Sequence, residues 1–405
     1  MNGDHADSRN STLTQPSKPV LNMKRKFLFC FATALLTAAR ALALNIPSDG
    51  SDGELSPTAD IVVDLSLAPT GAWNDDNTLN KGKGIYDPNK WAVVFKYTSV
   101  NIPAGAKVTF INHKSRAPVV WLVAGNVQID GTVSVAGNIR SLSAISRLAP
   151  VEAGPGGFRG GTEGPLGAGW GYGIGSSYDN CYHGAYASVY GNPQIIPLIG
   201  GSGGLGVIGD AGCSGIGGSG GGAILIAAGG NVSVSGIIDA NGGGTGSGGA
   251  VRIIASLASG AGQIQALPDG RIRIETPALA PTLRTSPETI AVAPPNNPII
   301  WPADDAPTVR VLTVDGQATP DDPTALVVST SDVAVQNNGT VQVILETKNF
   351  PIQGVVQVRS VRKYGGYTWV TAAYVPGGDF AHSTWIANIT FAPGFTTLQA
   401  RATVP

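Results

Sequence analysis

Apolar and polar positions alternate in short runs along most of the chain, and two separate stretches follow the same order. Residues 120–137, "VWLVAGNVQIDGTVSVAG", contain an apolar run, a glycine turn, Asn-Val, an alternating run, a glycine and a short apolar run. Residues 224–242, "ILIAAGGNVSVSGIIDANG", repeat that order. Short runs rich in Val and Ile with period-two alternation predict β-strands. We therefore expect a repeating all-β unit.

Further copies extend the repeat in both directions. The run "AVRIIAS" at 250–256 returns 27 residues after "AILIAAG" at 223–229. Short strands continue in "GQIQALPDGRIRIE" at 262–275, and "SVNIPAGAKVTFI" at 99–111 precedes them. Strands recurring every few tens of residues are typical of a β-solenoid, in which each coil stacks on the next and strands of successive coils pair in parallel. The pattern predicts a right-handed parallel β-helix with glycine-rich loops.

Glycine is concentrated in this region, where 37 of the 56 glycines lie between Gly154 and Gly262. Successive coils lie about 4.8 Å apart, so their corners leave little room for side chains and favour a backbone with positive φ. We expect Gly229 and Gly230 to occupy such a corner. A disordered Gly-Ser linker disagrees with the regular apolar strands, and collagen would need glycine at every third place. Packed polyglycine helices, or a β-sandwich with long glycine loops, stay open as alternatives.

The C-terminal region alternates without the glycine excess. Its runs are "TVRVLTV", "TVQVILET", "VVQVRSVRK", "YTWVTAAYV", "STWIANITF" and "TLQARATV". Six or seven such strands with Gly, Pro, Asn and Asp turns predict an antiparallel β-sandwich of immunoglobulin or fibronectin type. Eight prolines in residues 277–307 predict an extended linker before it. The expected organisation is a signal peptide, a glycine-rich β-helix domain, a proline-rich linker and a β-sandwich, at residues 1–43, 44–276, 277–307 and 308–405.

The N-terminal segment has the features of a secretion signal. A basic run at 24–26 precedes 13 residues, 27–39, that form an apolar core, and Ala41-Leu42-Ala43 supplies the small residues of a cleavage site. We expect translation to start at Met23. At 1.5 Å per residue the apolar core is too short to span a bilayer, which disfavours the alternative of a membrane anchor. The mature protein is therefore expected outside the cell or on its surface, without a transmembrane anchor.

Charge excludes one class of partner. Removing residues 1–43 takes away six basic and two acidic residues and leaves 20 basic and 25 acidic residues, a formal charge of −5. Nucleic-acid binding requires clustered Lys and Arg against the phosphates, and the mature sequence has no such cluster. We expect no nucleic-acid partner.

Two cysteines, Cys181 and Cys213, remain after export. In an exported protein such a pair predicts a disulfide. Cys181 and His183 could instead offer two metal ligands, but no second pair of ligands lies nearby in the sequence. We expect neither a metal nor a cofactor.

A long insertion separates the two main repeats. Its aromatic residues are most concentrated in residues 170–190, "WGYGIGSSYDNCYHGAYASVY". Aromatic rings on glycine-hinged loops can stack on sugars, while amide and carboxylate groups bond to hydroxyls. The alternative is that these rings cover the glycine-rich loops, which have few side chains of their own. The predicted ligand-binding residues are Trp170, Tyr172, Tyr178, Asp179, Tyr182, His183, Tyr186 and Tyr190.

Five segments together resemble a group of secreted glycine-rich bacterial proteins of the right-handed parallel β-helix type. They are "TGAWNDD" (70–76), "APVVWLVAGNVQIDGTVSVAG" (117–137), "GPGGFRGG" (154–161), "YGNPQIIPLIGGSGG" (190–204) and "GGGAILIAAGG" (220–230). The resemblance covers residues 58–275. It implies the fold, and it brings no catalytic motif.

The expected function is a structural or adhesive module that binds a polysaccharide or cell-surface glycan through the aromatic loop. The alternative is a polysaccharide lyase or glycoside hydrolase, since parallel β-helices host enzymes that use clustered carboxylates with Ca²⁺ or a basic residue. Aligning the repeats places Asp130 opposite Ser235 and Asp239 opposite Ser134, so these carboxylates do not stack. No catalytic residue is predicted. The charges on the predicted strands are Asp130, Asp239, Arg252, Arg271 and Arg273.

Overall fold

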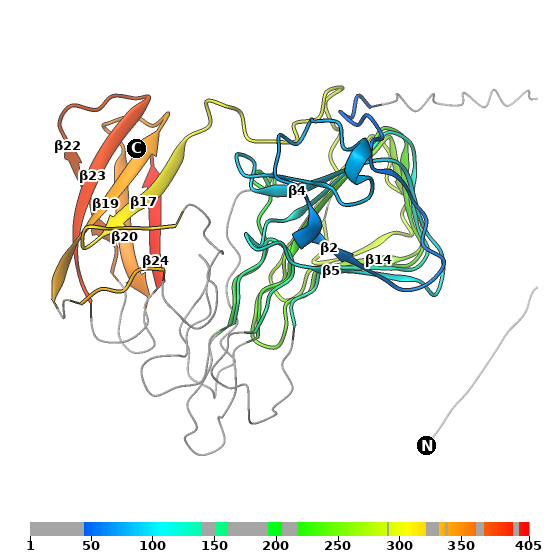
Figure 1. Ribbon diagram of the computed structural model, residues 1–405, viewed down its shortest axis with the longest axis horizontal. Helices are drawn as coiled ribbons and strands as arrows, with labels where there is room; N and C mark the ends of the chain where they lie inside the picture. Colours follow the sequence, from blue (N-terminus) through cyan, green and yellow to red (C-terminus); the bar gives the residue numbers. More distant parts are fainter. Residues whose placement is uncertain are drawn as a thin grey trace, which may run out of the picture. The chain divides into compact units, whose positions relative to one another are not determined.

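The computed structural model describes residues 44–138, 151–160, 193–204, 218–289, 291–320, 332–336, 339–361, 368–391 and 397–404. These ranges contain no α-helix, and their helical turns are two 3-10 helices, η1 (Leu65–Leu67) and η2 (Thr78–Asn80). No helix in them has the length and hydrophobicity needed to cross a membrane. The predicted signal peptide, residues 1–43, lies outside the described residues. The predicted all-β character is confirmed (Figure 1).

The first part of the chain winds through three parallel sets of strands, here called faces A, B and C. In each turn the chain passes from A to B to C and returns to A, which we call one coil. Face A comprises the first half of β4 (Ala92–Ile102), β6 (Val119–Val123), β9 (Ala223–Ala228), β12 (Ala250–Ile254) and β15 (Arg271–Glu275). Face B comprises the second half of β4, β7 (Val127–Ile129), β10 (Asn231–Val234) and β13 (Leu257–Ser259). Face C comprises β2 (Ile61–Asp64), β5 (Lys107–Ile111), β8 (Thr132–Ser134), β11 (Ile237–Asp239), β14 (Gln263–Gln265) and β16 (Arg284–Ser286).

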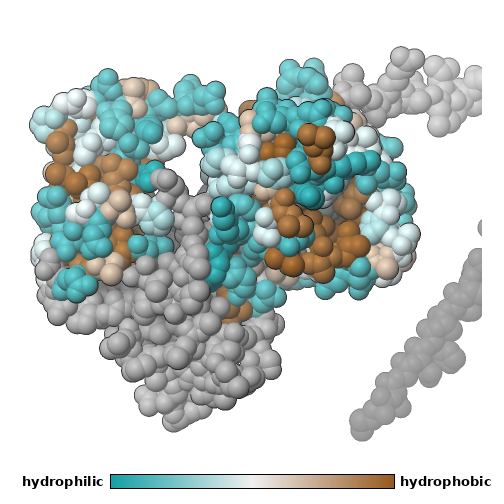
Figure 2. All heavy atoms as spheres, in the orientation of Figure 1, coloured by the Kyte–Doolittle hydropathy of each residue, from teal (hydrophilic) through white to brown (hydrophobic). Residues whose placement is uncertain are grey.

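Two short strands complete the N-terminal end of the stack. β1 (Gly53–Leu55) pairs in parallel with β4, and β3 (Ile85–Asp87) pairs with it antiparallel. In Figure 1 the coils lie behind one another, from the blue β2 to the yellow-green β14. In the same view, Figure 2 shows apolar surface over the region of β2 and β4, and Val62 and Leu67 are 61% and 57% exposed.

The strand register reproduces the sequence repeat. Ala250 lies opposite Ala223, as the 27-residue repeat predicts. Val120 lies opposite Leu225 across the long insertion, and Asp239 lies opposite Ser134. The repeated segments therefore stack on one another even where nearly 90 residues separate them in the chain.

Every second residue of the strands points inward, and these side chains fill the interior of the coils. Val119, Ile224 and Val251 are aligned on face A and fully buried, and Val133, Ile238 and Ile264 are aligned on face C in the same way. Burying a side chain of this size stabilises the fold by about 1.5–3 kcal/mol, so each added coil contributes its own layer of core.

Glycine-rich segments pack together where the chain passes from face C back to face A. We call residues 151–160, 193–204, 218–222 and 242–249 the glycine bundle. Within residues 218–222, Gly220 N donates to Phe158 O, Gly221 N to Ser247 O and Gly222 N to Val135 O, and Gly221 O accepts from Gly201 N. A strand bonds only two neighbours, whereas this segment bonds four, which is typical of threefold polyglycine helices and not of a sheet. The alternative of packed polyglycine helices stays a prediction for this part of the chain.

Close contact between coils, and not positive φ, explains the corner glycines. The expectation of positive φ at Gly229 and Gly230 is wrong, since neither adopts it. A Cβ on Gly229 would lie 2.5 Å from Ala124 O, and one on Gly230 would lie 2.2 Å from the Asn126 side chain. The neighbouring coil therefore excludes a side chain at this corner.

Residues 277–307, predicted to be an extended linker, belong to the coils along part of their length. β16 pairs with β14, and isolated bridges join Leu279 to Ala258 and Val292 to Glu275. Proline is tolerated here because a strand at the edge of a sheet needs hydrogen bonds on one side only. The parallel pairing thus continues past residue 276 to Val292.

From residue 308 onward the pairing is antiparallel. One sheet has the order β18-β17-β19-β23-β22 and the other has the order β21-β20-β24. Val343 and Trp385 of the first sheet and Val358 of the second lie in one shared core. The predicted antiparallel sheets are confirmed, with strands close to the predicted runs. The strands are β17 (Thr308–Val314), β18 (Gln317–Ala318), β19 (Thr340–Lys348), β20 (Val355–Val361), β21 (Val370–Thr371), β22 (Ala373–Val375), β23 (His382–Thr390) and β24 (Thr397–Thr403).

Candidate functional site

The outer surface of face A is apolar and is covered by segments from distant parts of the chain. Val94, Val120 and Leu225 point outward there, because their sequence neighbours fill the coil interior. Leu44 and Ile46 pack on this surface near the start of the described chain. The side chains that are only partly buried against it are Trp73, Leu198, Ile300 and Trp301. These covering segments leave hollows between them.

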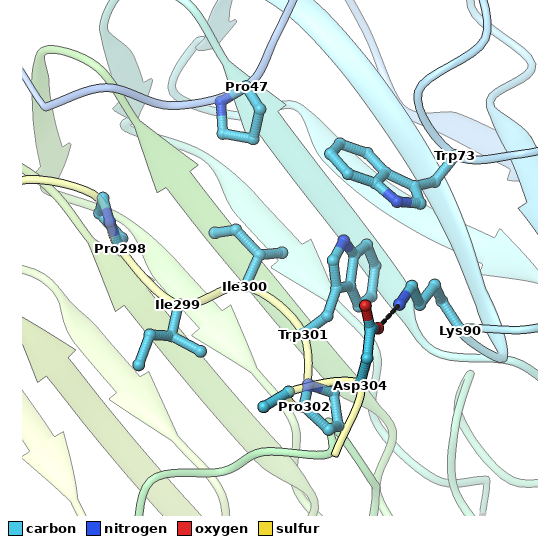
Figure 3. Close-up of a pocket in the computed structure, with 10 residues that line it drawn as sticks. Pro47, Trp73, Lys90, Pro298, Ile299, Ile300, Trp301, Pro302 and Asp304 are labelled. Atoms are coloured by element: carbon cyan, nitrogen blue, oxygen red, sulfur yellow. Dashed lines mark ion pairs between the residues drawn. The ribbon is translucent and has the colours of Figure 1, made fainter. Parts of the chain in front are cut away.

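Two adjacent open hollows share Pro47 and Trp73, and we call them together the Trp73 groove. The first, of about 370 Å³, lies between Trp73, Lys90 and residues 298–304. Figure 3 shows Trp73 and Trp301 on two sides of it, with the Lys90–Asp304 ion pair at one end and Pro298 at the other. The second, of about 380 Å³, is lined by Asn45, Ile46, Pro47, Ser48, Asp49, Trp73, Asn74 and Lys96. Each volume falls in the range of small-molecule sites.

The loop that carries Trp73 is held at several points. Asp87 accepts from Trp73 N at 3.0 Å, and its other carboxylate oxygen accepts from the backbone of Asn89 and Lys90. The Trp73 and Trp301 rings are 5.6 Å apart between centroids, with an interplanar angle of 56°. The Trp301 Nε1 hydrogen is buried and has no acceptor among the described residues.

A buried carboxylate anchors the same loop from beneath. Asp52, which is 2% exposed, accepts from Asn77 Nδ2 at 2.6 Å, from Lys96 N at 2.8 Å, and from the backbone N–H groups of Gly82 and Gly84. Burial raises the pKa of Asp52, and the four hydrogen bonds act in the opposite direction. These bonds fix residues 77–84, which follow Trp73 in the chain, onto β4.

The second hollow has a charged wall. The Lys96 side chain is 2% exposed, and its Nζ donates to Asp49 Oδ2 at 2.7 Å and to the backbone oxygen of Asp75. Burial alone would raise the pKa of Asp49, but hydrogen bonds from Lys96 and Ser51 outweigh it, so the pKa is lowered and the carboxylate is ionised at neutral pH. Asn45 and Asn74 are exposed beside this pair. The hollow thus offers two amides and one carboxylate to a ligand.

This arrangement suits a sugar. Indole rings present flat apolar faces to the C–H side of a pyranose, while amides and a carboxylate bond to hydroxyls. The described part of the chain has no group of three or more His, Cys, Asp or Glu side chains placed to hold a metal ion.

None of the predicted ligand-binding residues can be placed. Trp170, Tyr172, Tyr178, Asp179, Tyr182, His183, Tyr186 and Tyr190 lie outside the described residues. Cys181 and Cys213 lie outside them as well. The aromatic loop and the disulfide stay predictions.

The two strand-borne carboxylates do not converge on one site, whereas two of the arginines meet at Glu275. Asp130 Oδ2 accepts from Gln128, and Asp239 lies on face C opposite Ser134, as the aligned repeats predict. Arg252 and Arg273 both donate to Glu275 Oε1 at 2.8 Å, and the Arg252 and Glu275 side chains are 2% and 4% exposed. Burial lowers the pKa of Arg252 and nearby Glu275 opposes that shift. The two arginines and Glu275 thus form one ion cluster, in which Arg252 and Glu275 are buried.

The sequence interpretation missed the Trp73 groove. The sequence interpretation used residues 70–76 only as part of a resemblance. These residues nevertheless contain a tryptophan in a polar stretch rich in Asn and Asp. That composition is the signal that could have indicated an exposed aromatic platform. Its partners at 45–49 and 298–304 have no such signal, because only the fold brings them near Trp73.

Comparison with known proteins found no match. No protein-family model matches the chain, and no curated protein and no solved structure is significantly similar to it. The resemblance to secreted glycine-rich bacterial proteins therefore stays a prediction.

Proposed function

We propose that this protein is an extracellular structural or adhesive module that binds glycans, with the Trp73 groove as a binding site. One observation carries the proposal: Trp73 and Trp301 form a tilted ring pair beside the exposed groups of Asn45, Asn74 and Asp49. Sugar recognition needs an aromatic platform with hydrogen-bonding groups around it, and here both come from loops anchored to a regular sheet.

The coils are proposed to form a right-handed parallel β-helix, and the antiparallel sheets an immunoglobulin- or fibronectin-like sandwich. Support for the helix comes from the parallel order of strands on three faces and from the strong preference of parallel crossovers for the right hand. Support for the sandwich comes from two antiparallel sheets around one core. Both architectures serve as rigid supports for loops.

Secretion and the disulfide are proposed from the sequence. An export signal at residues 1–43 would carry the chain to an oxidising compartment, where Cys181 and Cys213 would bond. Mass spectrometry of the non-reduced mature protein should give one linked peptide pair and an N-terminus at residue 44. Two free thiols in protein recovered from its native compartment would contradict the disulfide.

Affinity electrophoresis of the full mature chain through gels that contain a panel of polysaccharides tests the groove. We expect one or more polysaccharides to retard the wild type, and Trp73→Ala to weaken that binding at least tenfold, which corresponds to about 1.4 kcal/mol. Asn74→Ala removes an exposed amide of the groove and should weaken binding while leaving the melting temperature unchanged. Phe380→Ala is the matched control, because Phe380 is an exposed aromatic (58%) in the antiparallel part.

Two outcomes would contradict the groove proposal. One is a wild type that binds no polysaccharide of the panel. The other is binding that Trp73→Ala and Asn74→Ala leave at the level of Phe380→Ala. If Trp170→Ala and Tyr182→Ala abolish binding in that second case, the predicted aromatic loop is the binding site.

A further inference from the structure

The outer face of the smaller antiparallel sheet carries an aromatic ring between two arginines. Inward-facing Val356 and Val358 of β20 lie in the core, so Gln357 and Arg359 point to the opposite side. On the neighbouring β24, Gln399 lies opposite Arg359, and Arg401 lies opposite Gln357. Thr371 of β21 lies opposite Gln357, which places the preceding outward residue, Trp369, beside Arg359.

Both guanidinium groups stack on the same indole. The central carbon of Arg359 lies 4.6 Å from the centroid of the Trp369 ring, and that of Arg401 lies 4.2 Å from it. At these distances each cation is attracted by the π-face of the ring. Trp369 is half-buried and Arg401 is exposed, so the cluster borders solvent. We call Gln357, Arg359, Trp369, Thr371, Gln399 and Arg401 the arginine–tryptophan patch.

Neutral amides orient the two arginines through their Nε atoms. Arg359 Nε donates to Gln399 Oε1 at 2.7 Å, and Arg401 Nε donates to Gln357 Oε1 at 2.9 Å. Gln357 Nε2 donates in turn to Thr371 Oγ1 at 3.2 Å. Within the described part of the chain, no carboxylate lies within 4.0 Å of the Arg401 guanidinium, and its two terminal nitrogens form no hydrogen bond. Arg401 therefore presents two donors in a fixed plane toward solvent.

We propose that the arginine–tryptophan patch binds an acidic polysaccharide built of uronic-acid residues. A guanidinium fork matches a carboxylate with two parallel hydrogen bonds, which a neutral sugar cannot provide. The indole holds both guanidinium groups in place, so a carboxylate of the polymer meets a preorganised donor. The charge of the patch is complementary to such a polymer, whereas the mature chain as a whole has a formal charge of −5. The patch is thus a local positive site on a chain whose net charge is negative.

The patch is independent of the Trp73 groove, and the two surfaces differ in what they recognise. The groove presents amides and a carboxylate, which suit neutral hydroxyls. The patch presents cations, so its binding should fall steeply with salt. The two can therefore be separated by ligand charge and by ionic strength.

The test uses the full mature chain on immobilised polygalacturonate, with neutral dextran and dextran sulfate in parallel. We expect retention on polygalacturonate at 50 mM NaCl, its loss at 500 mM NaCl, and no retention on dextran. Arg401→Gln should raise the dissociation constant at least tenfold while the circular dichroism spectrum stays that of the folded wild type. Lys107→Gln is the matched control, because it removes one exposed positive charge from face C, and it should change the constant less than twofold.

A second variant separates the ring from the charge. Trp369→Phe keeps an aromatic ring with a smaller π-face. We expect this variant to bind polygalacturonate more weakly than the wild type and more tightly than Arg401→Gln. Its binding should also keep more of the wild-type salt dependence than the binding of Arg401→Gln does. Trp73→Ala should retain full binding to this polymer. The proposal is overturned if no retention on polygalacturonate occurs, if Arg401→Gln and Lys107→Gln bind alike, or if only dextran sulfate retains the protein.

Discussion

Replacing Gly220 with alanine tests whether close contact between chain segments is what requires glycine in the bundle. A Cβ at this position would lie 1.9 Å from Gly201 O and 2.3 Å from the carbon of the same carbonyl. Ordinary carbon–oxygen contacts are about 3.3 Å or longer, so the segments would have to separate by more than about 1 Å. Gly201 cannot yield easily, because its N–H is bonded to Gly221 O at 2.7 Å.

The expected cost combines two effects. Overpacking a dense region costs about 1–3 kcal/mol. Separation of the segments also weakens the bond from Gly220 N to Phe158 O, 2.8 Å long, and the bond from Gly154 N to Gly220 O, each of which contributes about 0.5–1.5 kcal/mol. We therefore expect Gly220→Ala to destabilise the coils by about 2–5 kcal/mol.

Two control variants separate contact from backbone conformation. Gly105 has φ +86°, and a Cβ on it would have no atom within 4 Å, so Gly105→Ala should cost only the strain of positive φ, about 1–2 kcal/mol. Gly339 has neither positive φ nor a near neighbour, and Gly339→Ala should be neutral or stabilise by up to about 1 kcal/mol. The expected order of stability is Gly339→Ala, then Gly105→Ala, then Gly220→Ala.

Scanning calorimetry of the full chain, supported by urea titration, measures the effect. Gly220 and Gly105 both belong to the coil region, so their comparison carries the test, whereas Gly339 directly precedes β19 and gives the effect of an added methyl group in the antiparallel part. The argument from contact would be refuted if the free energy of unfolding of Gly220→Ala lay within about 0.5 kcal/mol of the wild-type value, or if it equalled that of Gly105→Ala.

Three further results are expected. Thermal melts should show that Trp385→Phe loses about 1–2 kcal/mol more folding stability than Trp301→Phe. The reason is that the Trp385 indole N–H donates to a threonine hydroxyl at 2.9 Å, whereas the Trp301 indole N–H has no acceptor in the described structure. Equal losses in the two variants would contradict this. Burial acts to raise the pKa of Glu346, but hydrogen bonds from His382 and a lysine outweigh it and lower the pKa. The contribution of Glu346 to stability is therefore present above the unfolded-state pKa of 4.5 and is lost as the pH falls through the lowered pKa of the folded state. Glu346→Gln should flatten the acid side of the profile of melting temperature against pH. An unchanged profile would argue against the pairing. Glu275→Gln should lower the urea midpoint by an amount equivalent to about 3–5 kcal/mol, because it leaves a buried guanidinium without its counter-charge, and a loss below about 1 kcal/mol would show that water reaches the cluster.

The repeat was predictable because each coil encodes its own strands. The order of apolar run, glycine turn and Asn-Val in residues 120–137 and 224–242 was enough to predict a shared register, and Val120 does lie opposite Leu225. The antiparallel strands were predictable for a similar reason: in β19 the alternation of single residues identifies the inward face, and Val341, Val343 and Leu345 are buried there.

The reason for glycine was harder to predict. Composition indicates that small residues are required, but it does not distinguish positive φ from contact with a neighbouring segment. At Gly229 the relevant atom is Ala124 O, more than 100 residues earlier in the chain. Long-range contacts of this kind have no local signature.

The candidate sites were largely beyond sequence reasoning. The walls of the Trp73 groove come from residues 45–49, 73–74 and 298–304, which alternation alone cannot bring together. In the arginine–tryptophan patch, Arg401 approaches Trp369 only because β20 lies between their strands. Sequence reasoning pointed to an aromatic-rich loop instead, because aromatic residues that are close together in the chain can be recognised from the sequence alone.

The long insertion between β8 and β9 has a consequence for how the chain folds. Most coils close over short separations, such as the 27 residues between Ala223 and Ala250, whereas β6 must find β9 across 105 residues from Val119 to Ile224. The entropy of closing the longer loop costs about 1.2 kcal/mol more. Distant pairings of this kind also slow folding. The coils on each side should therefore form first as two separate nuclei, and their union across the insertion should be the rate-limiting step.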